Sequence, residues 1–232
     1  PSIDYSNEFF QLLPFTPTSA QKRAISQAMA DMTDIKNRSP MSRLVQGDVG
    51  SGKTAVAAAL CYSVIKNGVQ AALMAPTEIL AQQHYASISN ILKNTGISVG
   101  LLTGSVTPAK KRKLIEQLQD GSIQMVIGTH ALISETVAFK NLGLVITDEQ
   151  HRFGVAQRSL LAEKGNHPHM LVMSATPIPR TLALIIYGDL DISVLDELPP
   201  GRQTIETYAI SSRKRARALQ YIRTHLDAGQ QA

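Results

Sequence analysis

The chain has 232 residues, 44% of them hydrophobic and 18% charged, which is the ordinary composition of a globular domain with a substantial core. No apolar stretch approaches the ~20 residues of a membrane span, and Pro1–Asp4 has neither the basic nor the apolar region of an export signal. A single cysteine, Cys61, excludes an internal disulfide and a multi-cysteine metal site, and favours a reducing, cytoplasmic compartment. The net charge of +5 favours a polyanionic partner. Because the sequence does not begin with Met, we expect it to be part of a longer polypeptide.

Short apolar runs alternate with amphipathic segments along most of the chain, as in repeated βαβ units. The predicted strands are Ser42–Gln46, Gln70–Ala75, Ser98–Thr103, Ile123–Gly128, Gly143–Asp148 and Met170–Ser174. The predicted helices are Ser19–Lys36, Gly52–Lys66, Glu78–Asn94, Pro108–Gln119, Gln157–Lys164 and Pro179–Tyr187. Because strands such as Leu142–Ile146 are apolar throughout, they predict an α/β fold with a doubly wound, mostly parallel sheet and helices on both faces.

The character of the sequence changes after residue 195. Residues 196–203 are a stiff polar connector containing Pro199 and Pro200. A predicted strand, Thr204–Ile210, and a basic helix, Arg213–Leu226, follow it. One strand and one helix cannot bury a core, so we expect residues 204–232 to begin a second domain. Residues 18–195 then form the main domain, and residues 1–17 lead into it.

A glycine-rich segment between the first predicted strand and its helix fits the phosphate-binding pattern G-x-x-x-x-G-K-[ST]. Its residues are Gly47, Asp48, Val49, Gly50, Ser51, Gly52, Lys53 and Thr54. The glycines let backbone amides approach a phosphate, and the helix N-terminus favours negative charge. Lys53 would reach the β and γ phosphates of ATP, and Thr54 would offer its hydroxyl to Mg²⁺. The segment therefore predicts a nucleoside triphosphate site.

Two consecutive acids end the apolar strand that begins at Leu142. Asp148 would hold Mg²⁺ together with Thr54, and Glu149 would polarise the attacking water. Acids are common at strand ends, but the upstream phosphate-binding segment favours a catalytic interpretation of this pair.

Further motifs resemble those of superfamily 2 helicases. The resemblance is carried by Asp148-Glu149-Gln150-His151 (motif II), Ser174-Ala175-Thr176 (motif III), Ala75–Glu78 (motif Ia), Thr103–Ser105 (motif Ib), Gly128–Ala131 (motif Ic) and Gln21 with Phe15 (Q motif). Longer stretches are similar to the RecG family of bacterial branched-DNA translocases, namely Arg152–Val155, Thr176–Ala183, Gly188–Asp191 and Asp196–Arg202. The resemblance covers nearly the whole chain and implies the first RecA-like motor lobe of such an enzyme.

The resemblance also implies roles for individual residues. Gln21 would bind the adenine with Phe15 beside it, and Lys53, Asp148, Glu149, Gln150 and His151 would form the catalytic set. Gln150 and His151 would connect the γ phosphate to Ser174, Ala175 and Thr176. The residues that would face the DNA backbone are Pro76, Thr77, Gly104, Ser105, Thr129 and His130.

Cofactors and partners follow from the same resemblance. It implies ATP with Mg²⁺, and branched double-stranded DNA such as forks and Holliday junctions. It further implies a monomer in the bacterial cytoplasm, with a wedge domain and a second RecA-like lobe elsewhere in the same polypeptide. The fragment alone would bind nucleotide with very weak turnover.

Several alternatives stay open at this stage. The motor of a transcription-repair coupling factor shares Arg152–Val155 and Pro177–Thr181, although Gln150 and the connector favour the RecG family. A metabolic kinase or nucleotide switch also carries the phosphate-binding pattern, but does not need the other motifs. The basic runs Lys110–Lys113 and Arg213–Arg217 are either solvated helix faces or DNA contacts.

The histidines also have structural interpretations. His130 and His151 could be core residues rather than functional ones. His84, His167, His169 and His225 are interpreted as structural or solvent-facing, and no third ligand accompanies His167 and His169.

Overall fold

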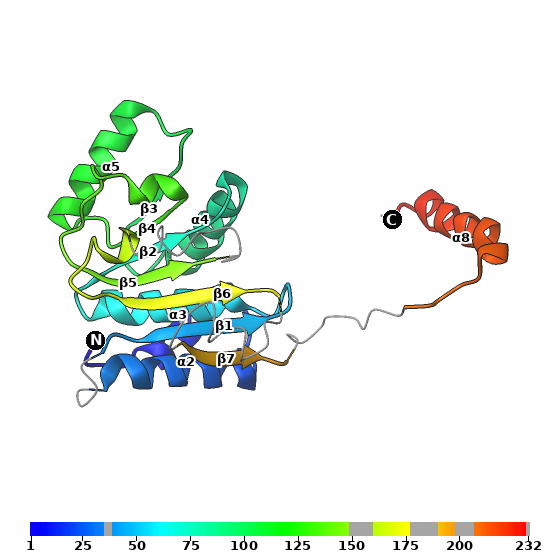
Figure 1. The fold of residues 1–232 in the computed structure, drawn as a ribbon, viewed down its shortest axis with the longest axis horizontal. Helices are drawn as coiled ribbons and strands as arrows, with labels where there is room; N and C mark the ends of the chain where they lie inside the picture. Colours follow the sequence, from blue (N-terminus) through cyan, green and yellow to red (C-terminus); the bar gives the residue numbers. More distant parts are fainter. Residues whose placement is uncertain (35–38, 149–159, 177–189, 198–206, 231–232) are drawn as a thin grey trace. The chain divides into compact units, whose positions relative to one another are not determined.

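The computed structural model describes residues 1–34, 39–148, 160–176, 190–197 and 207–230. The chain forms two compact units, Pro1–Pro200 and Gly201–Ala232. The first unit contains a parallel sheet whose described part has seven strands in the order β3-β4-β2-β5-β6-β1-β7 (Figure 1). The predicted α/β fold with a parallel sheet is therefore confirmed.

From β1 to β5 the elements of the first unit alternate between strand and helix along the chain. The strands are β1 (Ser42–Gly47), β2 (Gln70–Met74), β3 (Val99–Leu102), β4 (Met125–Gly128), β5 (Leu142–Thr147), β6 (His169–Ser174) and β7 (Asp191–Leu195). The helices are α1 (Ser6–Phe10), α2 (Ser19–Thr33), α3 (Lys53–Lys66), α4 (Glu78–Leu92), α5 (Pro108–Asp120) and the 3₁₀ turn η1 (His130–Ile133). Because the seven described strands are parallel, their carboxyl ends meet at one edge of the sheet.

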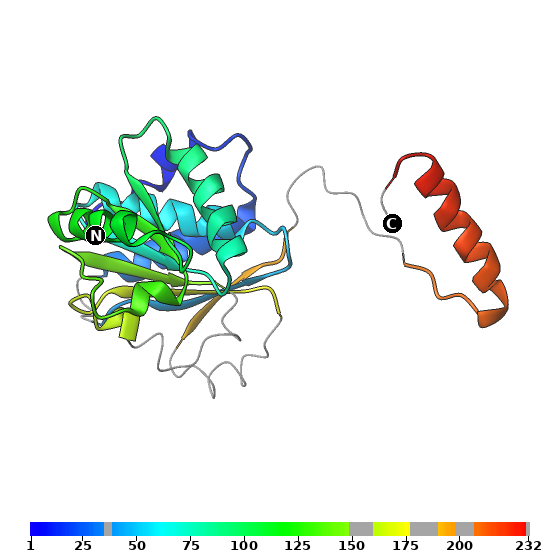
Figure 2. The ribbon, with the colours of Figure 1, turned by 90° about the horizontal axis from the view of Figure 1, so that it is seen from above.

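Two apolar layers cover the two faces of the sheet. Successive residues of β2 alternate between them, with Leu73 in one layer and Met74 in the other. The larger layer contains the buried faces of α2, α3 and α4, which lie on one side of the strands in Figure 2. Leu118 of α5 belongs to the other layer. Cys61 lies fully buried in α3, where burial raises the pKa of its thiol.

The boundaries differ from the predicted ones in a few places. Helix α2 ends at Thr33 because Asp34 takes an extended conformation, and Lys36 lies outside the described residues. Of the predicted helix Gln157–Lys164, residues 160–162 are helical and 157–159 are not described. The predicted helix Pro179–Tyr187 lies outside the described residues.

Strand β7 was not predicted from the sequence. It pairs in parallel with β1, with Leu44 opposite Ile192 and Val45 opposite Ser193. Arg43 fixes this edge, because its guanidinium donates to Ser193 Oγ at 2.9 Å and forms an ion pair with Asp31 of α2.

The second unit contains the 3₁₀ turn η3 (Ser212–Lys214) and helix α8 (Arg215–Asp227). The predicted strand Thr204–Ile210 is wrong for residues 207–210, which have no regular structure, and residues 204–206 are not described. A strand needs a hydrogen-bonding partner, and the described residues of this unit contain no second strand to provide one. Neither η3 nor α8 buries a residue, and Leu219, Tyr221, Ile222 and Leu226 of α8 are exposed. In the described part of the chain, no helix has the length and hydropathy to cross a membrane.

Candidate functional site

The phosphate-binding segment connects the end of β1 to the start of α3. Gly50 and Gly52 have φ angles of 82° and 88°, in the left-handed region that favours glycine. Gly52 is the N-cap of α3 and provides no side-chain acceptor, so no N-cap side chain satisfies the first amides of the helix. Such amides can bind an anion with help from the helix dipole. The local backbone therefore has the geometry that the sequence pattern predicts.

Lys53 lies folded back onto this segment. Its Nζ donates to the carbonyl oxygens of Gly47 at 2.6 Å and Asp48 at 3.0 Å. These contacts hold the ammonium beside the loop, where a phosphate group would compete with the two carbonyls for it. The contact of Lys53 with the β and γ phosphates stays a prediction.

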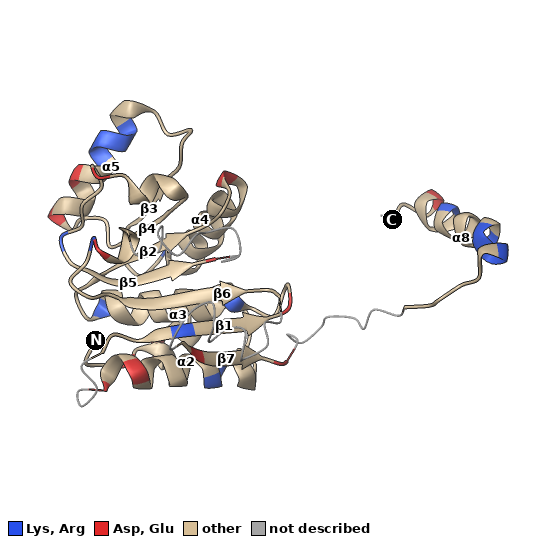
Figure 3. Cartoon of the chain, in the orientation of Figure 1, with Lys and Arg blue, Asp and Glu red and all other residues tan. Residues whose placement is uncertain are grey.

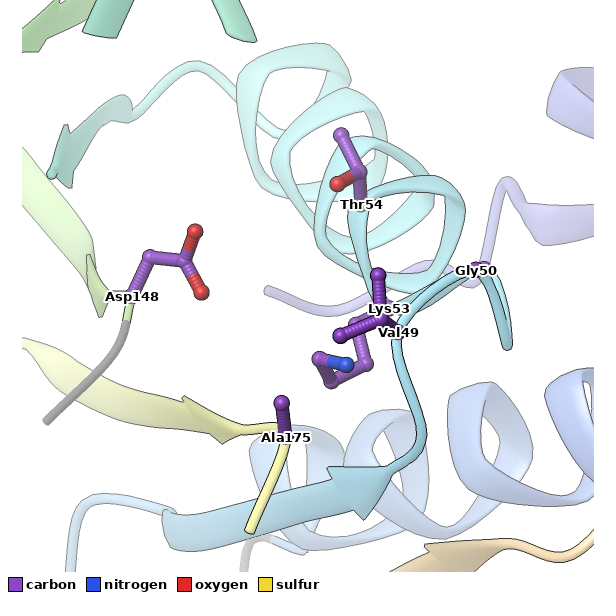
Figure 4. Close-up of a pocket in the computed structure, with 7 residues that line it drawn as sticks. Val49, Gly50, Lys53, Thr54, Asp148 and Ala175 are labelled. Carbon is purple, nitrogen blue, oxygen red and sulfur yellow. The ribbon is translucent and has the colours of Figure 1, made fainter. Parts of the chain in front are cut away.

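A cleft of about 260 Å³ brings three separate motifs together. It is lined by Val49, Gly50, Gly52, Lys53, Thr54, Asp148 and Ala175 (Figure 4). The Asp148 carboxylate and the Thr54 hydroxyl point into this cleft from opposite sides (Figure 4). Its volume lies below the range typical of drug-sized ligands, which suits a phosphate chain better than a whole nucleotide.

The donor set fits Mg²⁺. This ion prefers oxygen ligands and usually takes one or two from the protein, completing its shell with phosphates and waters. Thr54 Oγ1 and the Asp148 carboxylate are such ligands, on opposite sides of one cleft. Among the described residues, no group of three or more His, Cys, Asp or Glu side chains could hold a metal by itself. Thr54 and Asp148 are therefore the residues that would hold Mg²⁺ together with a nucleotide.

Asp148 directly follows β5 and is held against the end of the neighbouring strand β2. Its backbone amide donates to the carbonyl of Met74 at 2.9 Å. Its Oδ2 lies 2.6 Å from Nε2 of His84, and each of these two side chains is only 10% exposed. His84 was interpreted from the sequence as structural or solvent-facing, so its contact with the predicted metal ligand was missed. The available signal was its place on the helix that follows β2, the strand beside β5.

Gln21 supports the phosphate-binding segment through a side-chain hydrogen bond. Its Nε2 donates to the Ser51 carbonyl at 2.9 Å, and its Oε1 accepts from the Thr18 amide at 3.1 Å, completing a capping box at the start of α2. Gln21 is 1% exposed and does not line the cleft, whereas Phe15 is 45% exposed. Adenine binding by these two residues stays a prediction, and the structure adds a second role for Gln21.

The motif III residues lie at the carboxyl end of β6, whose last residue is Ser174. Ser174 is buried, and its Oγ lies 3.0 Å from Oγ1 of Thr176 and accepts from the Thr176 amide at 3.2 Å. Ala175 lines the cleft. The predicted catalytic residues Glu149, Gln150 and His151 lie outside the described residues.

The residues predicted to face DNA follow β2, β3 and β4, which are neighbours in the sheet. Gly104, Ser105 and His130 are exposed, and Pro76 and Thr77 are partly buried. Thr129 is 2% exposed, so its side chain lies beneath this surface. Their DNA contacts stay predictions.

Two side chains of motif Ia organise this surface. The Thr77 hydroxyl caps α4 by accepting from the Leu80 amide, and the Glu78 carboxylate accepts from the Ser105 amide at 3.1 Å. The loops after β2 and β3 are therefore joined by a side-chain contact.

The basic run at the start of α5 and His169 do not line the cleft. Lys110, Arg112 and Lys113 are exposed near the start of α5 (Figure 3), which fits either interpretation of this run. The basic residues at the start of α8 are exposed as well. His169 Nδ1 accepts from the Met41 amide at 2.9 Å, and burial lowers its pKa to about 4. A structural role for His169 agrees with the sequence interpretation.

Residues 18–185 match the DEAD/DEAH box helicase model, and the chain belongs to this family. Within it, the chain is similar to two proteins named ATP-dependent DNA helicase RecG. It is 56% identical to the one from Aquifex aeolicus over 89% of the chain and 26% of that protein, and 50% identical to the one from Synechocystis over 100% of the chain and 27% of that protein. The chain spans about a quarter of the length of these two relatives.

A solved structure of RecG bound to a three-way DNA junction matches the fold. It covers 97% of this chain and 30% of that chain, with a TM-score of 0.84 and 47% sequence identity. The RecG resemblance predicted from the sequence is therefore confirmed.

Proposed function

We propose that this chain is the first motor lobe of a RecG-like translocase, which couples ATP hydrolysis to branch migration and remodelling of stalled forks and Holliday junctions. The observation that carries the proposal is the cleft that joins the phosphate-binding segment, Asp148 and Ala175, in a chain about 50% identical to RecG along its length. A metabolic kinase would need the phosphate-binding segment but not the motif III residues beside it.

The described residues divide the work of nucleotide binding. The amides of the loop and of the first turn of α3 would surround the phosphates, and the Lys53 ammonium would exchange the Gly47 and Asp48 carbonyls for phosphate oxygens. Thr54 and Asp148 would hold Mg²⁺, whose chemical contribution when bound is to neutralise phosphate charge. Gln21 would keep the loop in shape through Ser51.

Hydrolysis involves the acids and polar residues that follow β5. Glu149 would orient and polarise the attacking water. Gln150 and His151 would connect the γ phosphate to Ser174 and Thr176, and this connection would couple hydrolysis to the DNA contacts.

DNA would lie across the carboxyl ends of β2, β3 and β4. Exposed amides and short hydroxyls there suit phosphate contacts, which position a protein on DNA without reading its sequence. A wedge domain and a second RecA-like lobe in the same polypeptide, a monomeric state and a cytoplasmic location belong to the same proposal.

The test is ATP turnover by the intact polypeptide with no DNA, linear duplex, forked DNA and four-way junctions, at several salt concentrations. Branched DNA should stimulate turnover more than linear duplex, and stimulation should fall as salt rises because phosphate contacts release counterions. Flat turnover across all DNA structures would reject the translocase assignment. Equal stimulation by linear and branched DNA would favour a coupling-factor type of motor instead.

A further inference from the structure

His84 is a buried polar residue that the proposed ATP chemistry does not yet use. It lies in the second turn of α4, and its Nε2 is 2.6 Å from Asp148 Oδ2. The two residues are 64 positions apart and come from different elements. This distance is that of a short hydrogen bond in which a ring N–H donates to a carboxylate oxygen.

The neighbours of His84 make its polarity unusual. The other buried residues of α4 are Ala81, Ile88 and Leu92, which pack into the larger apolar layer. An apolar side chain at position 84 would continue that pattern. Burying an imidazole is unfavourable unless it is hydrogen-bonded, and Asp148 provides the partner.

The hydrogen bond from His84 fixes the orientation of the Asp148 carboxylate, which the proposed Mg²⁺ site requires. Asp148 lines the cleft opposite Thr54 (Figure 4). Its backbone amide is held by the Met74 carbonyl. With the backbone fixed, rotation about the side-chain bonds is the remaining freedom of the carboxylate. A hydrogen bond to Oδ2 removes that freedom, as outer-shell partners of ligating carboxylates do in metal sites.

We propose that His84 is a positioning residue for the Mg²⁺–nucleotide site, where its Nε2 holds the Asp148 carboxylate in the orientation that binds the metal. The inference rests on the proposed ATP site and adds a residue to it. It also identifies a physical connection across the sheet edge, because α4 is capped by Thr77 in the region predicted to face DNA, whereas Asp148 belongs to the nucleotide cleft.

The test compares nucleotide binding with and without the metal in the 232-residue chain. Calorimetry gives the dissociation constant of a non-hydrolysable ATP analogue in Mg²⁺ and in EDTA, and their ratio measures the contribution of the metal. His84→Leu should reduce this ratio about 10-fold or more, while binding in EDTA stays as in the wild type. Mn²⁺ affinity of the nucleotide complex, followed by electron paramagnetic resonance, should fall in parallel.

Rescue distinguishes positioning from packing. The amide nitrogen of His84→Gln reaches about as far as Nε2 and should restore most of the ratio, whereas the shorter His84→Asn should behave like His84→Leu. Equal ratios in the Gln and Asn variants would overturn the proposal, even if the Leu variant does not fold. Ile88→Ala is the matched control, because it opens a cavity one turn further along α4 with a side chain that cannot bind Asp148. It should lower the melting temperature and leave the ratio unchanged.

Asp148→Asn separates failure of this inference from failure of the proposed site. If Asp148→Asn lowers the ratio and His84→Leu does not, His84 is not a positioning residue and the ATP site stands. If the wild-type ratio is unity and Asp148→Asn matches it, the proposed Mg²⁺ site itself is wrong.

Discussion

The carboxyl edge of the sheet has two halves that are held in different ways. In the nucleotide half, formed by the ends of β1, β5 and β6, side chains lock the backbone: Gln21 binds Ser51, and Lys53 binds the carbonyls of its own loop. In the other half, formed by the ends of β2, β3 and β4, exposed loops carry short side chains, joined through Glu78.

The difference matches the two tasks proposed for the halves. Phosphoryl transfer depends on groups held in one geometry. Contacts to a DNA backbone tolerate small displacements, because each adds a modest and sequence-independent amount of free energy. Substitutions should therefore have large effects in the nucleotide half and small ones in the other half.

The largest expected effect separates binding from hydrolysis. We expect residues 1–232 alone to bind ATP but to turn it over about 10³- to 10⁵-fold more slowly than the DNA-stimulated intact polypeptide, because arginines of a second lobe would stabilise the transition-state charge. Steady-state phosphate release by the purified chain measures this. Robust turnover by a monomeric chain would mean that the nucleotide half is complete without a second lobe.

Within the nucleotide half, two substitutions should separate the roles of the motifs. Glu149→Gln in the intact polypeptide should lower turnover about 10²- to 10⁴-fold, the usual contribution of a general base, and leave ATP affinity intact. Lys53→Ala should weaken ATP binding itself, by about 10-fold or more for a lost charged hydrogen bond. Binding isotherms and turnover on the same preparations distinguish them. Equal loss of binding in both variants would contradict this division of roles.

Packing around the loop predicts an intermediate effect. A Cβ at Gly52 would lie 2.1 Å from Gln21 Nε2, in a backbone with a φ of 88°. We therefore expect Gly52→Ala to break the contact between Gln21 and Ser51, to weaken ATP binding about 10-fold and to lower stability by about 1–3 kcal/mol. Calorimetry and thermal melts measure the two effects. Gly68→Ala is the control, because Gly68 has a φ of 84° but no atom within 4 Å of its added Cβ. If Gly68→Ala weakens ATP binding as much, the effect comes from general strain.

The sequence predicted the features that depend on local patterns. Apolar strands gave the parallel sheet, and the loop pattern gave the backbone around Gly50 and Gly52, because both are properties of short segments. The sequence did not predict β7, because this five-residue segment of polar and apolar residues becomes a strand only by pairing with β1. The contacts of Gln21 with Ser51 and of His84 with Asp148 were missed as well, because only tertiary packing brings the two residues of each pair together. The strand predicted at Thr204–Ile210 failed for residues 207–210 because propensity alone provides no pairing partner.

The smallest predicted effect lies in the DNA-facing half and depends on which residue replaces Glu78. The Glu78 carboxylate accepts from the Ser105 amide and also places a negative charge where DNA phosphates are expected. Glu78→Gln keeps an oxygen acceptor and removes the charge, so DNA should bind up to about fivefold more tightly at low salt, the range of a surface charge interaction. Glu78→Ala loses both and should bind DNA no more tightly than the wild type, because the loop after β3 loses its attachment.

Fluorescence anisotropy of labelled junction DNA measures the affinities of both variants, and the gain in the Gln variant should shrink at high salt as charges are screened. Binding by the Ala variant as tight as binding by the Gln variant would mean that only the charge matters, and that the contact with Ser105 does not organise this surface.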